Sequence, residues 1–306
     1  MAMKIIFMGT PKFAVPILKA IHESDHKILE VYTQPAARSG RGQKFNNSDV
    51  FSFAEQLNLK VRSPDKLETS IEINHFKNLK PDLVVVAAYG KILPTELLNI
   101  DKLLFINAHA SLLPKWRGAA PMQRAIMNMD SETGVSIMKI IPQLDAGPVM
   151  LQEKIRISKE MSYEELSKKM SIVGAKLILD SIKLIENNQA NFVEQKKSEA
   201  TYAKKIDKKE SKINWNENAS DVIAKINALN PSPGPWFNFS GSRIKIIKAK
   251  EINITGQPGV ILNENLIIAC SKNAIQILEL QKAGKKKTSA QEFLRGNKLK
   301  TGITLS

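Results

Sequence analysis

The chain has 306 residues, of which 43% are hydrophobic, and its formal net charge at pH 7 is +15. This length is enough for two domains with substantial cores, and the composition excludes a disordered or fibrous protein. No apolar run approaches the roughly 20 residues that span a bilayer, so we expect no membrane segment. The four apolar residues between Lys4 and Gly9 are too few for a secretory signal and predict a buried first strand.

Residues that could hold a metal are scarce in this sequence. The single cysteine, Cys270, excludes an intrachain disulfide and a cysteine-based metal site. The four histidines are scattered and lack the spacing of a zinc site. We therefore expect no metal, and the low cysteine content is typical of a reducing cytoplasm.

The positive charge is concentrated in the last third of the chain. Residues 201–306 contain 18 Lys and Arg against 8 Asp and Glu, whereas residues 1–200 contain 27 against 22. Such asymmetry favours a polyanionic partner that is bound through its phosphates. The alternative is a basic, well-solvated surface, and charge alone does not decide between the two.

Strands and helices alternate over the first 190 residues. The ranges predicted as strands are 4–9, 28–32, 60–62, 81–88, 103–109, 134–140 and 150–157. Helical patterns separate most of them, and the longest begins at Ser162 and Glu165, which are spaced as a capping box. The alternation predicts an α/β domain with a doubly wound, mostly parallel, Rossmann-like sheet. The turn after Gly9 lacks the G-x-G-x-x-G pattern, which argues against a dinucleotide.

One polar segment, residues 34–48, interrupts the alternation. It contains Arg38, Arg41 and Lys44 and no acidic residue. Connections of this length without secondary structure of their own are uncommon and are often functional. The alternative is a disordered surface loop.

Beyond about residue 210 the pattern changes to short strands with turn signals. The predicted strands are 243–250, 259–262, 266–270 and 274–280, and helical segments are predicted at 219–229 and 290–295. This pattern predicts a small β-barrel of the oligonucleotide-binding (OB) type. We therefore divide the chain into an α/β domain at 1–189, a linker at 190–209 and a C-terminal β-barrel domain at 210–306.

The strand at 103–109 ends in two polar side chains. Asn107 and His109 are two residues apart in extended backbone, so their side chains point to the same side. Ligands of open α/β sheets bind at the carboxyl ends of the strands, which is where this pair lies. Asp145 follows in a tight loop between two later strands, and a carboxylate close to an imidazole would orient the ring.

These three residue types suit one class of reaction. An imidazole can take or deliver a proton, and an amide N–H can stabilise the oxyanion that forms on a carbonyl under attack. Asn107, His109 and Asp145 therefore fit acyl or formyl transfer through a tetrahedral intermediate, with no covalent nucleophile. The alternative is a structural loop pair and an ordinary turn residue, and these residues alone leave both interpretations open.

The sequence around Asn107, His109 and Asp145, which we call the trio, resembles the formyltransferase family that uses 10-formyltetrahydrofolate. The segments Asn107 to Gly118 and Leu144 to Gly147 carry the resemblance, which extends over essentially the whole chain. Further matching segments are Phe7–Ala14, Thr33–Pro35, Gly40–Gly42, Val86–Pro94, Gly118–Arg124, Thr201–Lys205, Ile213–Trp215, Asn230–Pro231, Pro235–Phe237 and Ala283–Lys286. The 34–48 loop and the basic C-terminal region are similar to those of the members that act on methionyl-tRNA.

The resemblance implies transfer of the formyl group of 10-formyltetrahydrofolate to the amino group of initiator methionyl-tRNA, for translation initiation in a bacterial cytoplasm. It implies catalytic roles for Asn107, His109 and Asp145. The residues matched to the folate site are Ser111, Leu112, Leu113, Pro114, Tyr89, Gly90, Ile92 and Leu93. The residues matched to the tRNA-gripping loop are Arg41, Arg38 and Lys44, and the family's C-terminal barrel binds the tRNA body. We expect a monomer.

The loop departs from the family pattern at one point. Ala36-Ala37-Arg38-Ser39 stands where an Asp-Arg-Pro-Ala run is usual, although Arg41 is retained. Two alternatives remain for the function. One is a formyltransferase that acts on a small amine, such as a nucleotide sugar or a purine precursor. The other is a non-catalytic RNA-binding relative that keeps the fold.

Overall fold

The computed structural model of the chain describes residues 2–39, 44–297 and 299–305. The described residues form two compact units. The first unit lies within residues 1–121, 132–156 and 167–203, and the second lies within residues 122–131, 157–166 and 204–306. The domain limits expected from the sequence, at 189 and 210, stay predictions.

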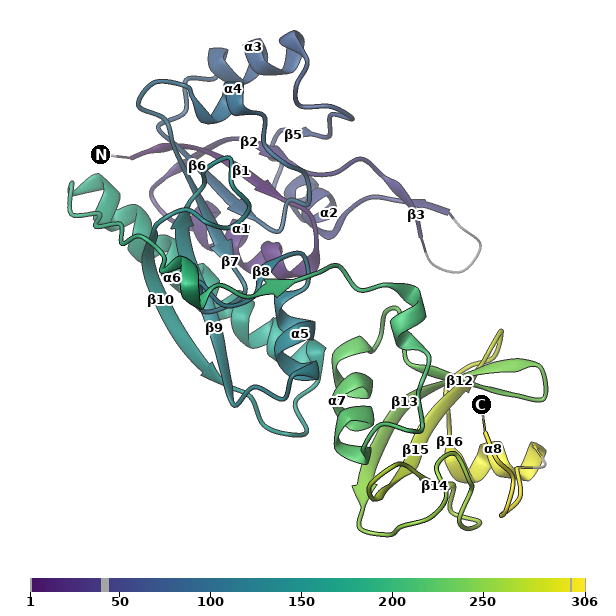
Figure 1. The fold of residues 1–306 in the computed structure, drawn as a ribbon. Coiled ribbons are helices and arrows are strands. Elements are labelled where there is room, and N and C mark those ends of the chain that lie inside the picture. The colour runs from purple at the N-terminus through teal and green to yellow at the C-terminus, as the bar shows by residue number, and fades with distance from the viewer. Residues whose placement is uncertain (1, 40–43, 298, 306) are drawn as a thin grey trace. The chain divides into compact units, whose positions relative to one another are not determined.

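A mostly parallel sheet forms the centre of the first unit, with the strand order β10-β9-β7-β6-β1-β2-β5 (Figure 1). The parallel strands are β1 (Lys4–Gly9), β2 (Lys27–Tyr32), β5 (Val61–Arg62), β6 (Leu83–Ala87) and β7 (Leu104–His109). At one edge β9 (Glu132–Lys139) and β10 (Val149–Arg156) run antiparallel to their neighbours. Every residue of β6 is buried, as expected for a central strand covered on both faces.

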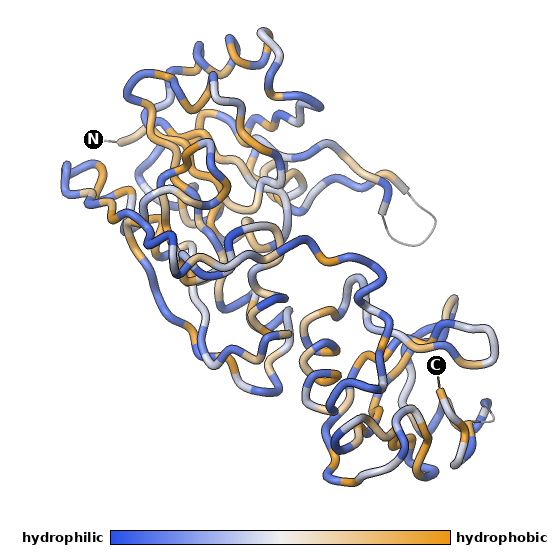
Figure 2. The backbone as a smooth tube through the Cα atoms, in the orientation of Figure 1, coloured by the Kyte–Doolittle hydropathy of each residue, from blue (hydrophilic) through white to orange (hydrophobic). Residues whose placement is uncertain are grey.

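Helices cover both faces of this sheet. The helices of the first unit are α1 (Val15–His22), α2 (Asp49–Gln56), α3 (Ser70–Asn78), α4 (Thr95–Leu98) and most of α6 (Tyr163–Glu186). On one face Ile6 and Val84 pack with Phe76 of α3. On the other face α1 meets α6 closely, because a Cβ added at Gly174 would lie 3.3 Å from the side chain of Ile17. Figure 2 shows hydrophobic residues along the inner strands. The predicted doubly wound domain is therefore confirmed.

Three strands of the sheet are tied together at their carboxyl ends. The Thr10 hydroxyl donates to the Tyr89 carbonyl at 2.8 Å, and the Gln34 side-chain amide donates to the same oxygen at 3.0 Å. Gly90 follows with φ +83°, and any Cβ there would collide with the Gln34 amide. This edge is therefore held by specific contacts between the ends of β1, β2 and β6.

Residues 34–48 contain a β-hairpin where the sequence predicted a loop without secondary structure. The strands β3 (Ala37–Ser39) and β4 (Lys44–Asn46) pair antiparallel and project from the sheet (Figure 1). The guanidinium carbon of Arg38 lies 5.4 Å from the centre of the Phe45 ring. Strands this short leave no alternating pattern in the sequence, which is why the prediction missed them.

The second unit contains an antiparallel sheet, which agrees with the short strands predicted for the C-terminal domain, whereas its closure into an OB-type barrel stays a prediction. Its strands are β12 (Trp236–Phe239), β13 (Ser242–Ile252), β14 (Ile267–Ala269), β15 (Ala274–Lys282) and β16 (Thr288–Ser289), and its helices include most of α5 (Pro121–Met127), α7 (Ala219–Leu229) and α8 (Ala290–Gly296). Trp215 and Phe237 meet edge to face in its core, with ring centres 5.9 Å apart. The strand predicted at 259–262 is present only as isolated bridges at Val260 and Ile261.

The segment expected as a linker contains two attachments to the first unit. Val193 and Val149 exchange two backbone hydrogen bonds of 2.8 Å each. Farther along, β11 (Tyr202–Ala203) pairs in parallel with β8 (Arg117–Gly118). Residues 193–203, which we call the connector, therefore lie against the same loops that follow β7 and β9. Over the part of the chain that the structure describes, no helix has the length and apolar character needed to cross a membrane.

Candidate active site

The end of β7 places two polar side chains on one face of the sheet. Asn107 and His109 lie on this strand between β6 and β9, with Asn107 opposite Val86 on one side and Met138 on the other. Asn107 is half-buried, and His109 is only 6% exposed. The period of two along a strand puts both side chains on the same face, as the sequence predicted.

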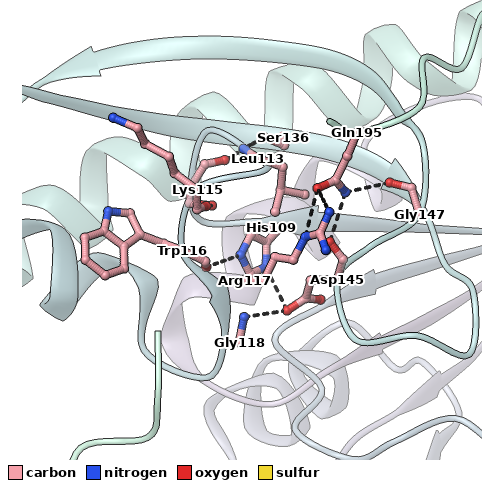
Figure 3. Close-up of polar contacts among 11 residues, drawn as sticks. His109, Leu113, Lys115, Trp116, Arg117, Gly118, Ser136, Asp145, Gly147 and Gln195 are labelled. Carbon is pink, nitrogen blue, oxygen red and sulfur yellow. Dashed lines mark hydrogen bonds and ion pairs between the residues drawn. The ribbon is translucent and has the colours of Figure 1, made fainter. Parts of the chain in front are cut away.

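The ring of His109 is held by a loop carbonyl on one side and faces a carboxylate on the other (Figure 3). Its Nε2 lies 3.0 Å from the Trp116 carbonyl oxygen, and its Nδ1 lies 3.7 Å from Asp145 Oδ2. A carbonyl oxygen only accepts hydrogen bonds, so Nε2 carries a proton and donates. In a neutral ring Nδ1 is then the nitrogen with a free lone pair. A proton taken at Nδ1 would lie beside a carboxylate.

Asp145 reaches this position from the loop between β9 and β10. Its backbone has φ +45°, which is uncommon for a residue with a side chain. Its Oδ2 accepts a hydrogen bond from the Gly118 N–H at 2.8 Å, and its side chain is 14% exposed. The carboxylate is therefore positioned from both sides, by the loop after β7 and by the loop after β9.

The side-chain amide of Asn107 is available to a ligand. No hydrogen bond joins it to any other residue in the described part of the chain. A half-buried amide at a strand end, next to a buried imidazole, can donate to an oxygen that enters the site.

The segment 111–114, which the sequence matched to a folate site, is held by hydrogen bonds from side chains of β9 and β10. The Ser136 hydroxyl donates to the Ser111 carbonyl at 2.6 Å and accepts from the Leu113 N–H at 3.0 Å. Gln152 donates to the same hydroxyl and to the Leu113 carbonyl. The Ser111 hydroxyl is buried and donates to the Lys115 carbonyl, so it closes the loop. Leu112 and Pro114 are partly exposed, and the Leu113–Pro114 peptide is cis.

The second segment matched to the folate site follows β6. Tyr89 and Leu93 are buried, whereas Ile92 is 87% exposed. Burial raises the pKa of Tyr89 to about 12, so its hydroxyl stays neutral and is unsuited to proton transfer. Leu144, beside Asp145, is a further exposed apolar residue, which the resemblance did not assign to the folate site.

Two of the residues matched to the tRNA-gripping loop, Arg38 and Lys44, belong to the strands β3 and β4. Arg38 is exposed on β3 and stacks near Phe45, whose side chain is 68% exposed. The backbone of Lys44 begins β4. Arg41 lies outside the described residues.

The site network includes two further residues, Arg117 and Gln195, of which Gln195 was not predicted from the sequence. Arg117 is buried, and its Nε and Nη2 donate to Gln195 Oε1 at 3.1 and 2.9 Å. Gln195 Nε2 donates in turn to the carbonyls of Asp145 and Gly147 at 2.9 and 2.7 Å (Figure 3). A lone glutamine in a polar stretch carries no signal of its own, and the contact spans 50 residues of sequence. Among the described residues, no three His, Cys, Asp or Glu side chains are grouped as metal ligands.

Two family profiles match the chain in succession. Residues 3–182 match the profile described as formyl transferase, and residues 205–298 match the profile of the formyl transferase C-terminal domain. The chain is 48% identical over 308 aligned positions to the methionyl-tRNA formyltransferase of Pelagibacter ubique, covering 100% of this chain and 99% of the relative. It is 42% identical to the methionyl-tRNA formyltransferase of a Chelativorans species, with both chains fully covered.

Solved structures with the same fold are more distant in sequence. HypX from Aquifex aeolicus in complex with tetrahydrofolic acid superposes with a TM-score of 0.69 at 17% identity, over 96% of this chain and 47% of that one. WlaRD, a sugar 3N-formyl transferase, superposes with a TM-score of 0.67 at 22% identity, over 94% of this chain and 100% of that one. These likenesses show the fold. The two profiles and the relatives at 48% and 42% identity establish that the chain belongs to the formyl transferase family, and within it to the methionyl-tRNA formyltransferases.

Proposed function

We propose that this chain transfers the formyl group of 10-formyltetrahydrofolate to the amino group of initiator methionyl-tRNA, giving formylmethionyl-tRNA for translation initiation. The observation that supports this best is the meeting of Asn107, His109 and Asp145 at one sheet edge, in a chain that matches methionyl-tRNA formyltransferases over its full length.

The reaction exchanges one carbon–nitrogen bond for another. The methionyl nitrogen bonds to the formyl carbon, and the bond between that carbon and the donor nitrogen breaks. The attacking amine loses one proton and the departing nitrogen gains one. Negative charge develops on the formyl oxygen while both nitrogens are attached to the carbon, so the site must stabilise an oxyanion and move a proton.

Asn107 and His109 divide these two tasks in our proposal. Asn107 directs its unpartnered amide N–H groups at the formyl oxygen. His109 takes the proton of the amine at Nδ1, because its Nε2 already donates to the Trp116 carbonyl. The resulting imidazolium faces the Asp145 carboxylate, with Nδ1 3.7 Å from Oδ2. His109 then returns the proton to the departing nitrogen.

The residues around the trio fit a flat, partly apolar donor. Ile92 and Leu144 expose large apolar side chains in the loops that follow β6 and β9. Exposed apolar residues are often part of ligand sites. We assign the donor to these two residues, with Gly90 and Leu93 beside Ile92 and the segment 111–114 as further wall. Ser111 and Leu113 act there through the loop they stabilise, since both side chains are buried.

The tRNA is bound in our proposal by Arg38, Arg41 and Lys44 of the 34–48 segment and by the basic C-terminal domain. Residues 201–306 carry 18 Lys and Arg against 8 Asp and Glu, which suits a phosphate backbone. We propose that the enzyme acts as a monomer in the bacterial cytoplasm.

The decisive test gives the purified chain initiator methionyl-tRNA and 10-formyltetrahydrofolate and measures formylmethionine released from the tRNA. We expect formylated product in amounts that follow enzyme concentration. A parallel panel of amino-sugar nucleotides and small purine-precursor amines tests the alternative substrate class. Absence of product with methionyl-tRNA from a folded protein would sink the proposal, and turnover of a small amine alone would reassign the substrate.

A further inference from the structure

The connector contributes a side chain to the loop that carries Asp145. Gln195 lies on this segment and is half-buried. Its Nε2 donates to the backbone carbonyls of Asp145 and Gly147, at 2.9 and 2.7 Å. Both carbonyls lie on the C-terminal side of the Asp145 Cα, so one amide group holds the backbone at and directly after the residue whose carboxylate faces His109.

The loop needs such support because its backbone is unfavourable on its own. Asp145 has φ +45°, a backbone region that residues with a side chain seldom adopt unless their surroundings fix it. Gly147 lies so close to the Lys139 carbonyl that no Cβ fits. The other fixed point is the hydrogen bond from the Gly118 N–H to Asp145 Oδ2, which holds the side chain.

Arg117 fixes the orientation of the Gln195 amide. It is 3% exposed, and its two N–H groups both point at Gln195 Oε1. An amide oxygen only accepts and an amide NH₂ only donates, so this oxygen must face the guanidinium and the NH₂ must face the two carbonyls. The reversed amide would leave the buried guanidinium and both carbonyls without partners, which is costly.

We propose that Gln195 is a positioning residue for formyl transfer: oriented by Arg117, it sets the place of the Asp145 carboxylate relative to His109. This inference rests on the proposed catalytic role of Asp145. The connector was expected only to join two domains. The inference gives it a part in the chemistry of the first unit.

Gln195→Glu separates this role from simple packing. Glutamate has the same length and can still accept from Arg117, but it has no N–H to donate. Its second oxygen would face the carbonyl oxygens of Asp145 and Gly147 and push the loop away. We expect kcat to fall by about 10- to 100-fold, since a shift of about 1 Å in a catalytic group has effects of this size. The KM values for methionyl-tRNA and for the formyl donor should change by less than about twofold, because Gln195 is not placed on either substrate.

Lys196→Ala is the matched control. Lys196 is the next residue on the connector, and its exposed side chain pairs only with Glu199, at 3.2 Å, among the contacts of the described chain. We expect wild-type kcat and melting temperature for this variant. Gln195→Met is a second test without added charge, and it should show the same fall in kcat at unchanged KM.

A double-mutant cycle with Asp145→Asn decides whether Gln195 acts through Asp145. We expect Asp145→Asn to lower kcat and Gln195→Glu to have no further effect in that background, because residues that act as a unit are not additive. Equal loss from Gln195→Glu in both backgrounds, or no loss in the wild type, would overturn the inference while leaving the proposed function intact. Unchanged kcat in Asp145→Asn would instead refute the role of Asp145 itself, and the inference with it. Hydrogen exchange of residues 141–148 provides a readout without turnover: it should accelerate in Gln195→Glu and stay unchanged in Lys196→Ala.

Discussion

At the scale of single residues, His109 donates from Nε2 to the Trp116 carbonyl, which leaves Nδ1 for the proton transfer that we propose. That proposed role needs a side chain that can both accept and donate a proton. The role that we propose for Asn107 differs, since it needs an N–H donor without charge.

Replacement of His109 by glutamine tests the proton transfer. Glutamine can keep a hydrogen bond to the Trp116 carbonyl but cannot take a proton, so we expect kcat to fall by about 10²–10⁴-fold. The kcat of His109→Ala should fall at least as far. Affinity for the folate donor, measured by calorimetry, should be largely kept in both variants. Unchanged turnover in either would remove His109 from the mechanism.

Replacement of Asn107 by alanine or aspartate tests the oxyanion contact. Loss of one such donor typically lowers kcat by about 10²–10³-fold, and the negative charge of aspartate should make the loss at least as large. Because no described residue bonds the Asn107 amide, we expect the melting temperature of Asn107→Ala to stay close to that of the wild type. A large fall in melting temperature with little change in kcat would identify a structural residue instead.

At the scale of elements, the β3–β4 hairpin has the features of a nucleic-acid contact. Arg38 and Phe45 form an exposed cation–π pair, in which the ring presents an apolar face and the guanidinium a positive charge. Exposed aromatic rings beside basic residues bind nucleic acids by stacking on bases. Thr33 and Ser48 join the two ends of the loop through hydroxyl groups 2.6 Å apart, so the hairpin leaves the sheet from a closed base.

Phe45→Ala should therefore raise the KM for methionyl-tRNA by about tenfold, the effect of losing one stacking contact. Phe45→Trp should keep the wild-type KM for methionyl-tRNA, since tryptophan also presents an aromatic face. The KM for the formyl donor and the melting temperature should be unaffected because the ring is exposed. If the alanine and tryptophan variants show the same KM for tRNA as the wild type, the hairpin ring has no part in tRNA binding.

Sequence patterns predicted some of these elements and missed others for physical reasons. A buried strand that ends in Asn107 and His109 is visible because strand periodicity and residue type coincide there. The hairpin was missed because three-residue strands show no period. Gln195 was missed because its partners are distant in sequence and two of them are backbone carbonyls, which any residue type supplies. The positive φ of Asp145 was equally invisible, since aspartate is common in ordinary turns.

At the scale of the whole molecule, charge pairing affects both stability and substrate binding. Arg124 on α5 binds Glu210 through two N–H groups, at 2.7 and 3.0 Å, and also donates to the Lys204 carbonyl. The Arg124 hydrogen bonds lower the pKa of Glu210 below its ordinary value of 4.5. The segment from Lys204 to Glu210 is thereby bound to α5 within the second unit.

Glu210→Gln should destabilise the protein in a pH-dependent way. A carboxylate with a lowered pKa in the folded state contributes stability above its unfolded pKa and loses it as the pH falls through the folded value. The wild type should therefore melt higher than the variant at pH 7, by an amount corresponding to about 0.5–1 kcal/mol after allowance for solvent screening. The difference should disappear below the lowered pKa. A difference in melting temperature that does not change between pH 7 and strongly acidic pH would contradict the prediction.

The uneven charge predicts a steep effect of salt on the tRNA reaction. Lys and Arg that neutralise phosphates release counterions, so log(kcat/KM) for methionyl-tRNA should fall linearly with log salt concentration. The KM for the formyl donor should change much less over the same range. If kcat/KM for methionyl-tRNA does not change with salt concentration, the net charge of +15 belongs to a solvated surface that does not bind tRNA.

The connector also determines where sequences of this family can be recombined. The two family profiles end at residue 182 and begin at residue 205, so a hybrid enzyme could be joined anywhere between them on sequence grounds. A joint at 189 would replace Gln195 and β11 with a foreign segment and would have to rebuild the support of Asp145. A joint after Ala203 keeps each of these contacts, so hybrids made there should retain the turnover of the first unit's chemistry, provided that the incoming domain still offers partners to Arg124 as Lys204 and Glu210 do.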